Sequence, residues 1–138
     1  MNLTIHTDGG SLNNPGPAAC AYTIDHGKTR IAARSFFLGT QTNNVAEYTG
    51  VIEALKKVKA LQKEARVSSV YFICDSLLLV NQMKGTYKIK NMGIKALASE
   101  ASRLIEEIKI PVSFTHVLRE HNSEADGLVK KEFALHHS

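Results

Sequence analysis

Apolar and polar side chains alternate along the first part of the chain, as expected of strands with one buried face. Residues 2–8 follow this alternation from the start, and residues 18–25 and 29–38 repeat it. Glycine, asparagine and proline are frequent in residues 9–17, which we predict to be a loop. A tight turn separates the second and third runs, so the first three strands are expected to form an antiparallel meander.

Further along the chain, apolar positions recur every three or four residues, which predicts helices. We expect helices at residues 45–63, 77–83, 94–108 and from 123 onward. Residues 70–74 are apolar on both faces, which is typical of a central strand, and residues 112–117 are predicted to form a last strand. The order βββαβααβα predicts an α/β fold: one domain, residues 1–138, with a mixed five-stranded sheet flanked by helices.

Size and composition narrow the classes that the chain can belong to. Its 138 residues, 43% of them hydrophobic and 22% charged, are typical of one globular domain that needs no disulfide to fold. We expect no membrane span and no signal peptide, because no apolar run of the required length occurs and the N-terminus enters a strand pattern at once. Cys20 and Cys74 lie in strand-like runs and are expected to be buried, reduced thiols, which fits a cytoplasmic protein.

Four carboxylates lie at the ends of predicted strands or in the first turns of predicted helices: Asp8, Glu47, Asp75 and Asp126. If the first and fourth strands are parallel neighbours, Asp8 and Asp75 come close together, and the other two enter from helices. Carboxylates that share one place repel each other and stay ionised only with cations between them. Because hard oxygen ligands suit Mg²⁺ or Mn²⁺, the pattern predicts a metal-dependent enzyme that acts on phosphates.

Each carboxylate also has a purely structural interpretation. Asp8 could belong to an ordinary turn, and Asp75 could mark only a strand-to-helix junction. Glu47 and Asp126 could each be the acid of a capping box at the start of a helix. Their joint occurrence at convergent places favours the metal site. A net charge of +4 fits this, because a basic protein that gathers its acids at one site suits a polyanionic substrate.

Several segments, in this order, resemble the motifs of type 1 ribonuclease H, and most closely those of its compact branch in archaea and many bacteria. They are Asp8-Gly9-Gly10 with Asn14-Pro15-Gly16-Pro17, then Thr42-Asn43-Asn44-Val45-Ala46-Glu47-Tyr48, then Cys74-Asp75-Ser76, and finally His116 to Asp126. The resemblance extends from Leu3 to about Ala134. One such motif alone is a weak signal, whereas the full set in order with sensible spacing is specific.

The resemblance implies a ribonuclease H-like fold and an endonuclease that cuts the RNA strand of an RNA–DNA hybrid, leaving 3′-hydroxyl and 5′-phosphate ends. It implies that Asp8, Glu47, Asp75 and Asp126 are the catalytic set and hold two Mg²⁺ or Mn²⁺ ions. We expect a monomer with no membrane partner. Two alternatives stay open. One is a non-catalytic hybrid-binding module, which would be expected to lack a carboxylate; the other is the same chemistry on double-stranded RNA or on RNA–DNA junctions.

The same resemblance implies residues that bind the hybrid around the first loop and the start of the first helix. They are Asn13, Asn14 and Gly16 in the loop, and Thr42, Asn43 and Asn44 at the helix. The helix asparagines would read the wide minor groove, with the threonine near a DNA phosphate. The structural interpretations are a plain turn for the loop and helix capping by Asn43 or Asn44.

A basic segment follows the short helix that is predicted at residues 77–83. Lys88 and Lys90, with Lys84 and Tyr87 near them, are the expected basic contact to the duplex. The alternative is a solvated loop. Longer bacterial members of the family carry a basic protrusion here, so this chain would hold the duplex with fewer charges.

The segment around the last aspartate departs from the family pattern. Many relatives have a histidine on the loop before it, thought to shuttle protons or to help the product leave. His121 could serve as an auxiliary catalytic residue, since an imidazole titrates near neutral pH, but Glu120 lies nearest the usual position. The alternative is a surface histidine. Gly127 and the run Val129–Lys131 are also unusual, so we expect the last helix to hold Asp126 loosely.

Overall fold

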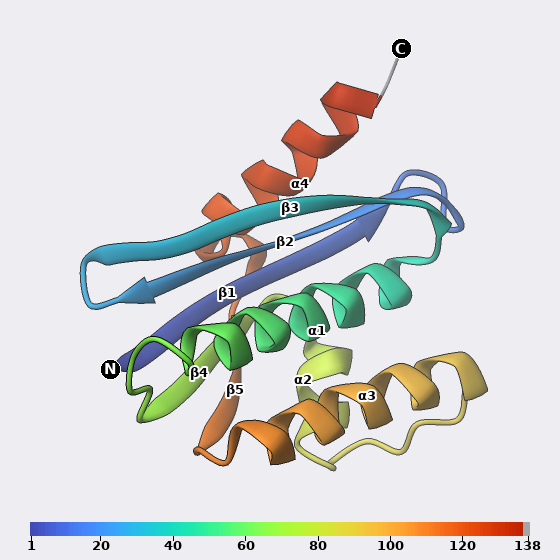
Figure 1. The fold of residues 1–138 in the computed structure, drawn as a ribbon. Helices are drawn as coiled ribbons and strands as arrows, with labels where there is room; N and C mark the ends of the chain where they lie inside the picture. The colour runs from blue at the N-terminus through green and yellow to red at the C-terminus, as the bar shows by residue number, and fades with distance from the viewer. Residues whose placement is uncertain (137–138) are drawn as a thin grey trace.

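The computed structural model describes residues 1–136, which form a five-stranded sheet with helices on both faces (Figure 1). In chain order the elements are β1 (Asn2–Ser11), β2 (Gly16–His26), β3 (Thr29–Gln41), α1 (Asn43–Leu61), β4 (Ser69–Cys74), α2 (Leu77–Met83), α3 (Met92–Ile108), β5 (Val112–His116), the short 3₁₀ helix η1 (Arg119–His121) and α4 (Ser123–His136). The sheet order is β3-β2-β1-β4-β5, with β1–β2 and β2–β3 antiparallel and β1–β4 and β4–β5 parallel. The predicted mixed sheet is confirmed.

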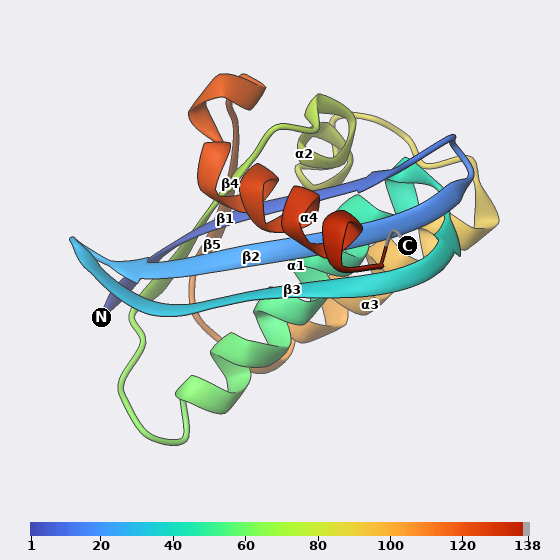
Figure 2. The ribbon, with the colours of Figure 1, turned by 90° about the horizontal axis from the view of Figure 1, so that it is seen from above.

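The helices cover the two faces of the sheet unequally (Figures 1 and 2). On one face α1 lies against the sheet with α3 packed beside it, and on the other face α4 crosses β2, β1 and β3. The stripe of Val51, Leu55 and Val58 predicted from helical spacing is buried in α1. Phe72 of β4 stacks on Phe114 of β5, with ring centroids 4.9 Å apart. The main hydrophobic core therefore lies between the sheet and the helices on the face that α1 covers.

The parallel pairing of β1 with β4 places two carboxylates at the same height along the strands. The register pairs Thr7 with Cys74, so the next residues, Asp8 and Asp75, follow at the same end of the two strands. A hydrogen bond joins Thr7 Oγ1 and Cys74 Sγ, 3.1 Å apart. The first and fourth strands are thus the central parallel neighbours that the carboxylate pattern required.

The predicted loop at residues 9–17 is too long, because β1 continues to Ser11. Gly9 and Gly10 extend the antiparallel ladder with β2 and are strand residues. Glycine suggests a turn because of its backbone freedom, but here its lack of a side chain allows β1 and α1 to approach closely. The strand β3 likewise runs beyond its predicted end, to Gln41.

The start of α1 also differs from the prediction. Thr42 caps the helix, since its Oγ1 accepts a hydrogen bond from the backbone N–H of Val45 at 3.3 Å. The interpretation of Asn43 or Asn44 as the cap is therefore wrong. The capping-box interpretation of Glu47 is wrong as well, because that role belongs to the third residue after the cap. The side chain of Glu47 is free for another purpose.

Cys20 and Cys74 are free thiols in buried strand positions, as predicted. Burial raises the pKa of each thiol to about 12, so both stay protonated at neutral pH. Across residues 1–136, no helix combines the length and apolar composition needed to cross a membrane.

Candidate active site

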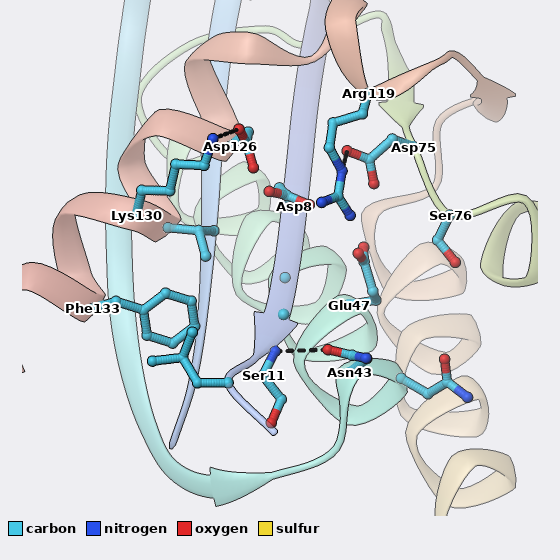
Figure 3. A pocket seen from close by; sticks show the side chains of 15 residues that line it. Asp8, Ser11, Asn43, Glu47, Asp75, Ser76, Arg119, Asp126, Lys130 and Phe133 are labelled. Atoms are coloured by element: carbon cyan, nitrogen blue, oxygen red, sulfur yellow. Dashed lines mark hydrogen bonds and ion pairs between the residues drawn. The ribbon is translucent and has the colours of Figure 1, made fainter. Parts of the chain in front are cut away.

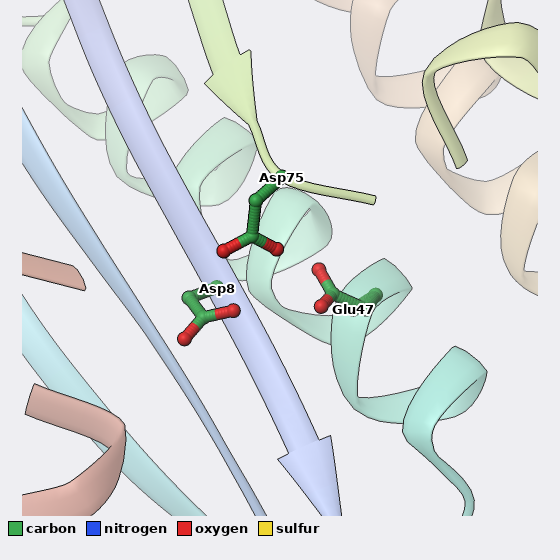
Figure 4. A group of neighbouring side chains, drawn as sticks. All are labelled: Asp8, Glu47 and Asp75. Atoms are coloured by element: carbon green, nitrogen blue, oxygen red, sulfur yellow. The ribbon is translucent and has the colours of Figure 1, made fainter. Parts of the chain in front are cut away.

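Three carboxylates from three different elements meet at one end of the central strands (Figure 4). Asp8 lies on β1, Asp75 follows the last residue of β4, and Glu47 lies early in α1. One carboxylate oxygen of each residue lies within 4.8 Å of those of the other two. The structure therefore brings together three of the four carboxylates that the sequence singled out.

The strand β1 and the helix α1 can approach closely because glycines remove side chains from their contact. A Cβ atom on Gly9 would lie 2.4 Å from the backbone carbonyl carbon of Ala46, the residue before Glu47. On the helix side, a Cβ on Gly50 would lie 3.3 Å from the backbone oxygen of Asp8. Only glycine fits at Gly9 without moving backbone, so this residue sets the distance at which Glu47 faces Asp8.

Asp8 and Glu47 are almost excluded from water, with 3% and 6% of their surface exposed. Burial, together with the negative charges of Asp75 and Asp126, raises the pKa of Asp8 to about 7. Burial, followed by the charges of Asp8 and Asp75, also raises the pKa of Glu47 well above 4.5. A buried group of this kind favours bound protons unless a cation neutralises it.

The donor atoms of this group fit a divalent cation. Asp8 Oδ1 and Glu47 Oε2 are buried and find no hydrogen-bond partner within residues 1–136. A buried polar atom without a partner is destabilising, and a bound cation would supply the missing interaction. Carboxylate oxygens are the hard ligands that Mg²⁺ and Mn²⁺ prefer. Asp8, Glu47 and Asp75 are therefore suitable metal ligands.

Asp126 lines the same pocket from α4 but stands apart from the tight group formed by the other three described carboxylates (Figure 3). Its Oδ2 atom forms an ion pair with Lys130 Nζ, 2.9 Å away and one helical turn along α4. The carboxylate thus engages a side chain, whereas a capping-box acid would accept from a backbone N–H. The four predicted carboxylates share one pocket, with Asp126 on its α4 side.

Two asparagines tie the first loop to the start of α1. Asn43 Oδ1 accepts from the backbone N–H of Ser11 at 2.7 Å, and Asn14 Oδ1 accepts from the backbone N–H of Asn43 at 2.9 Å. Asn43 and Asn44 also line the pocket beside the carboxylates. The predicted substrate-binding asparagines of the helix therefore lie on the rim of the carboxylate pocket, and Asn14 is bonded to that rim.

The other predicted residues in this region have clear local roles. Thr42 caps α1, as described above. Asn13 has a φ of 61°, a left-handed conformation that asparagine tolerates better than most residues. A Cβ on Gly16 would lie 1.8 Å from the backbone oxygen of Leu12, so no side chain fits there. Asn13 and Gly16 therefore shape the loop, in agreement with the turn interpretation.

Lys88, Lys90 and His121 do not line the carboxylate pocket in the described part of the chain. Lys88 lines a separate hollow between α2 and α3, and Lys90 lies in the connection between those helices. His121 is exposed in η1, with its Nε2 3.5 Å from Glu120 Oε1. The structure does not bring these side chains to Asp8. They could take part in binding or catalysis only by contacting the substrate away from the carboxylates, or after their segments move.

Two residues near the carboxylates were not singled out from the sequence. Asn122 is buried, and its Nδ2 donates to the backbone oxygen of Thr7 at 2.8 Å and to Asp75 Oδ2 at 3.3 Å. Arg119 Nε lies 4.0 Å from the same Asp75 oxygen. Both belong to the motif that ends at Asp126, which was the signal available. Asn122 joins the segment before α4 to β1 and β4.

The raised pKa values predict that stability without metal falls as the pH rises. Protonated Asp8 contributes fully below its unfolded value of 3.8, and that contribution is lost as the pH rises through its folded pKa of about 7. We expect the free energy of unfolding in a chelator to fall by a few kcal/mol between about pH 5 and pH 8. Urea unfolding at several pH values measures this. Asp8→Asn should flatten the dependence, and an equal fall in that variant would contradict the assignment.

The fold and the site together define a class of proteins. Buried carboxylates lie on β1, after β4 and on the helix that follows the meander, and a fourth comes from the last helix. This strand order, with an acidic pocket at the end of its central strands, is that of a ribonuclease H-like fold.

Known proteins support this and identify the family. The family model described as reverse transcriptase-like matches residues 6–132. Bifunctional protein Rv2228c of Mycobacterium tuberculosis is 39% identical over 132 residues, which are 93% of this chain and 34% of that protein. Ribonuclease H of Helicobacter pylori is 31% identical over 140 residues, covering 96% of this chain and 93% of its own. The chain belongs to the type 1 ribonuclease H family.

A solved structure is similar throughout. The crystal structure of LC11-RNase H1 in complex with an RNA/DNA hybrid superposes with a TM-score of 0.89 and 34% sequence identity, covering 96% of this chain and 99% of the other. The chain spans about a third of the length of the first curated relatives that it matches.

Proposed function

We propose that the protein is a metal-dependent endonuclease that hydrolyses the RNA strand of RNA–DNA hybrids. The observation that carries the proposal is the group of Asp8, Glu47 and Asp75, whose carboxylate oxygens lie within 4.8 Å of one another in a pocket of a ribonuclease H fold. Two of these side chains are buried with an oxygen left unpaired within the described part of the chain. Such a group suits cations better than any role in packing.

The four carboxylates would hold two Mg²⁺ or Mn²⁺ ions. Asp8, Glu47 and Asp75 would supply the inner ligands, and Asp126 would add its oxygens from α4. With ions held by these residues, the site would supply activation of a water molecule and stabilisation of the leaving oxygen for an in-line phosphodiester displacement, with 3′-hydroxyl and 5′-phosphate ends as the expected products. The protein contributes the fixed positions of the carboxylates and the hydrogen bond from Asn122 that orients Asp75.

An RNA–DNA hybrid is the substrate that the surroundings favour. LC11-RNase H1, similar over nearly the whole chain, binds such a hybrid in its crystal structure. The amide groups of Asn43 and Asn44 on the pocket rim are suited to the minor groove of an A-form-like duplex, where 2′-hydroxyls are exposed. Asn14 would hold that rim in position through its bond to Asn43.

Charges at a distance from the carboxylates would bind the rest of the duplex. Lys88 and Lys90 lie on the α2–α3 connection, where they would meet phosphates away from the cleavage point. An auxiliary role for His121 would require η1 to move toward the pocket, since the imidazole is exposed beside Glu120. We further propose that the protein acts as a monomer in the cytoplasm, in keeping with its free, buried thiols.

The test uses duplexes of one sequence: an RNA–DNA hybrid, double-stranded RNA, double-stranded DNA and a DNA duplex with a single ribonucleotide. Each is labelled on one strand and incubated with Mg²⁺, Mn²⁺ or a chelator. The proposal expects cleavage of the RNA strand of the hybrid only, in the presence of metal only. Binding of the hybrid without cleavage would favour a binding module, and equal cleavage of double-stranded RNA would replace the substrate assignment.

A further inference from the structure

A lysine occupies the α4 side of the carboxylate pocket. Lys130 lines the pocket together with Asp8 and Asp126 (Figure 3). Its ammonium nitrogen lies 2.9 Å from Asp126 Oδ2, and the two side chains form an ion pair. The carboxylate that stands apart from the tight group therefore has a close cationic partner, whereas Arg119 approaches Asp75 only to 4.0 Å.

The two members of this ion pair differ in their freedom to move. The Asp126 side chain is 16% exposed, whereas the Lys130 side chain is 73% exposed. An exposed lysine on a flexible stem can leave its partner at small cost, and an acid followed four residues later by a lysine is a weak pair on a helix. The contact is thus strong enough to occupy a carboxylate oxygen and weak enough to be displaced.

A metal ion and an ammonium group compete for the same carboxylate. An ion that recruits Asp126 must displace Lys130 or share the carboxylate with it, and the lysine charge also repels the approaching cation. Asp8, Glu47 and Asp75 have no such competitor as close as 2.9 Å in the described structure. The competition therefore acts on the ion that uses Asp126.

We propose that Lys130 is a positioning residue that sets the metal requirement of the site by holding Asp126 until a divalent ion displaces it. This inference rests on the proposed metal-binding role of the carboxylates. In this role Lys130 sets the concentration of Mg²⁺ or Mn²⁺ at which all the ligands engage the metal, and it takes no direct part in cleavage.

The test is titration of Mn²⁺ into the full chain by calorimetry, at about pH 8, above the pKa of about 7 of Asp8. Lys130→Met should bind Mn²⁺ about two- to fivefold more tightly, the range that corresponds to an exposed ion pair. Lys131→Met is the matched control, because it removes the same charge from an exposed neighbour outside the pocket lining. It should leave the affinity close to that of the unmodified chain.

Two further variants separate this inference from the proposed function. Asp126→Asn should weaken Mn²⁺ binding. Adding Lys130→Met to it should not change the affinity further, because the carboxylate for which the lysine and the ion compete is gone. If Asp126→Asn binds Mn²⁺ normally, the proposed ligand set is wrong. If Asp126→Asn weakens binding while Lys130→Met and Lys131→Met behave alike, the ligand set stands and the role of Lys130 is overturned. Circular dichroism verifies that each variant is folded.

Discussion

Replacing Asp75 with asparagine is expected to abolish cleavage of the RNA strand, with a loss of at least about a thousandfold in kcat. Asparagine keeps the shape of the side chain and an oxygen that can accept from Asn122 Nδ2, so the fold should persist. It removes one of the negative charges that raise the pKa of Asp8 and Glu47. Stability without metal should therefore be unchanged or higher while activity is lost.

Single-turnover cleavage of a labelled hybrid and urea unfolding measure the two effects together. Asp25→Asn is the matched control, since it makes the same chemical change at an aspartate on the far end of β2 that is paired with Arg30. That variant should retain activity within a few-fold. Activity of Asp75→Asn close to that of the unmodified chain would mean that the carboxylate group is not the reaction centre.

Gly9→Ala is expected to have the second-largest effect, on both stability and activity. The added methyl group would lie 2.4 Å from the backbone of Ala46, where no side chain can rotate away. We expect a loss of about 3 kcal/mol in the free energy of unfolding, at the upper range for overpacking. Because α1 must shift to make room, Glu47 moves relative to Asp8, and cleavage should fall about a hundredfold at temperatures where the variant is folded.

Gly10→Ala provides the control for Gly9→Ala. It is the next residue of β1, and a Cβ there would meet only Asn43 Oδ1, at 3.9 Å. Its stability should change by less than about 1 kcal/mol, because the position is ordinary strand. Equal effects of the two substitutions would show that the close approach of β1 and α1 does not set the geometry of the site.

Much of the fold could be predicted because its periodic segments are long. The alternation in residues 2–8 and the helical stripe of Val51, Leu55 and Val58 each specify one buried face, and the structure has both. The errors fall where one residue type serves two purposes. Gly9 suggested a turn, yet it is strand that passes close to a helix. Asn43 suggested a helix cap, yet its side chain bonds to Ser11 and Thr42 is the cap.

The candidate site was predictable to the extent that it depends on strand ends. Asp8 and Asp75 follow paired residues of parallel neighbours, so the topology alone brings them together. The segment before α4 was harder to predict, because its contacts come from a packing that no periodicity encodes. Asn122 was missed although it is buried against β1. His121 was chosen for its chemistry, yet it is not among the described residues that line the pocket.

The hydrogen bonds between the first loop and α1 limit which groups of a substrate the rim of the carboxylate pocket can recognise. The amide oxygens of Asn14 and Asn43 are both engaged by backbone N–H groups, so each side chain has mainly its N–H donors left to offer. In a minor groove every base pair presents acceptors, and the pattern hardly distinguishes one sequence from another. The N–H donors of Asn14 and Asn43 would therefore contact any base sequence with similar affinity, and discrimination would rest on the sugars and on the width of the groove.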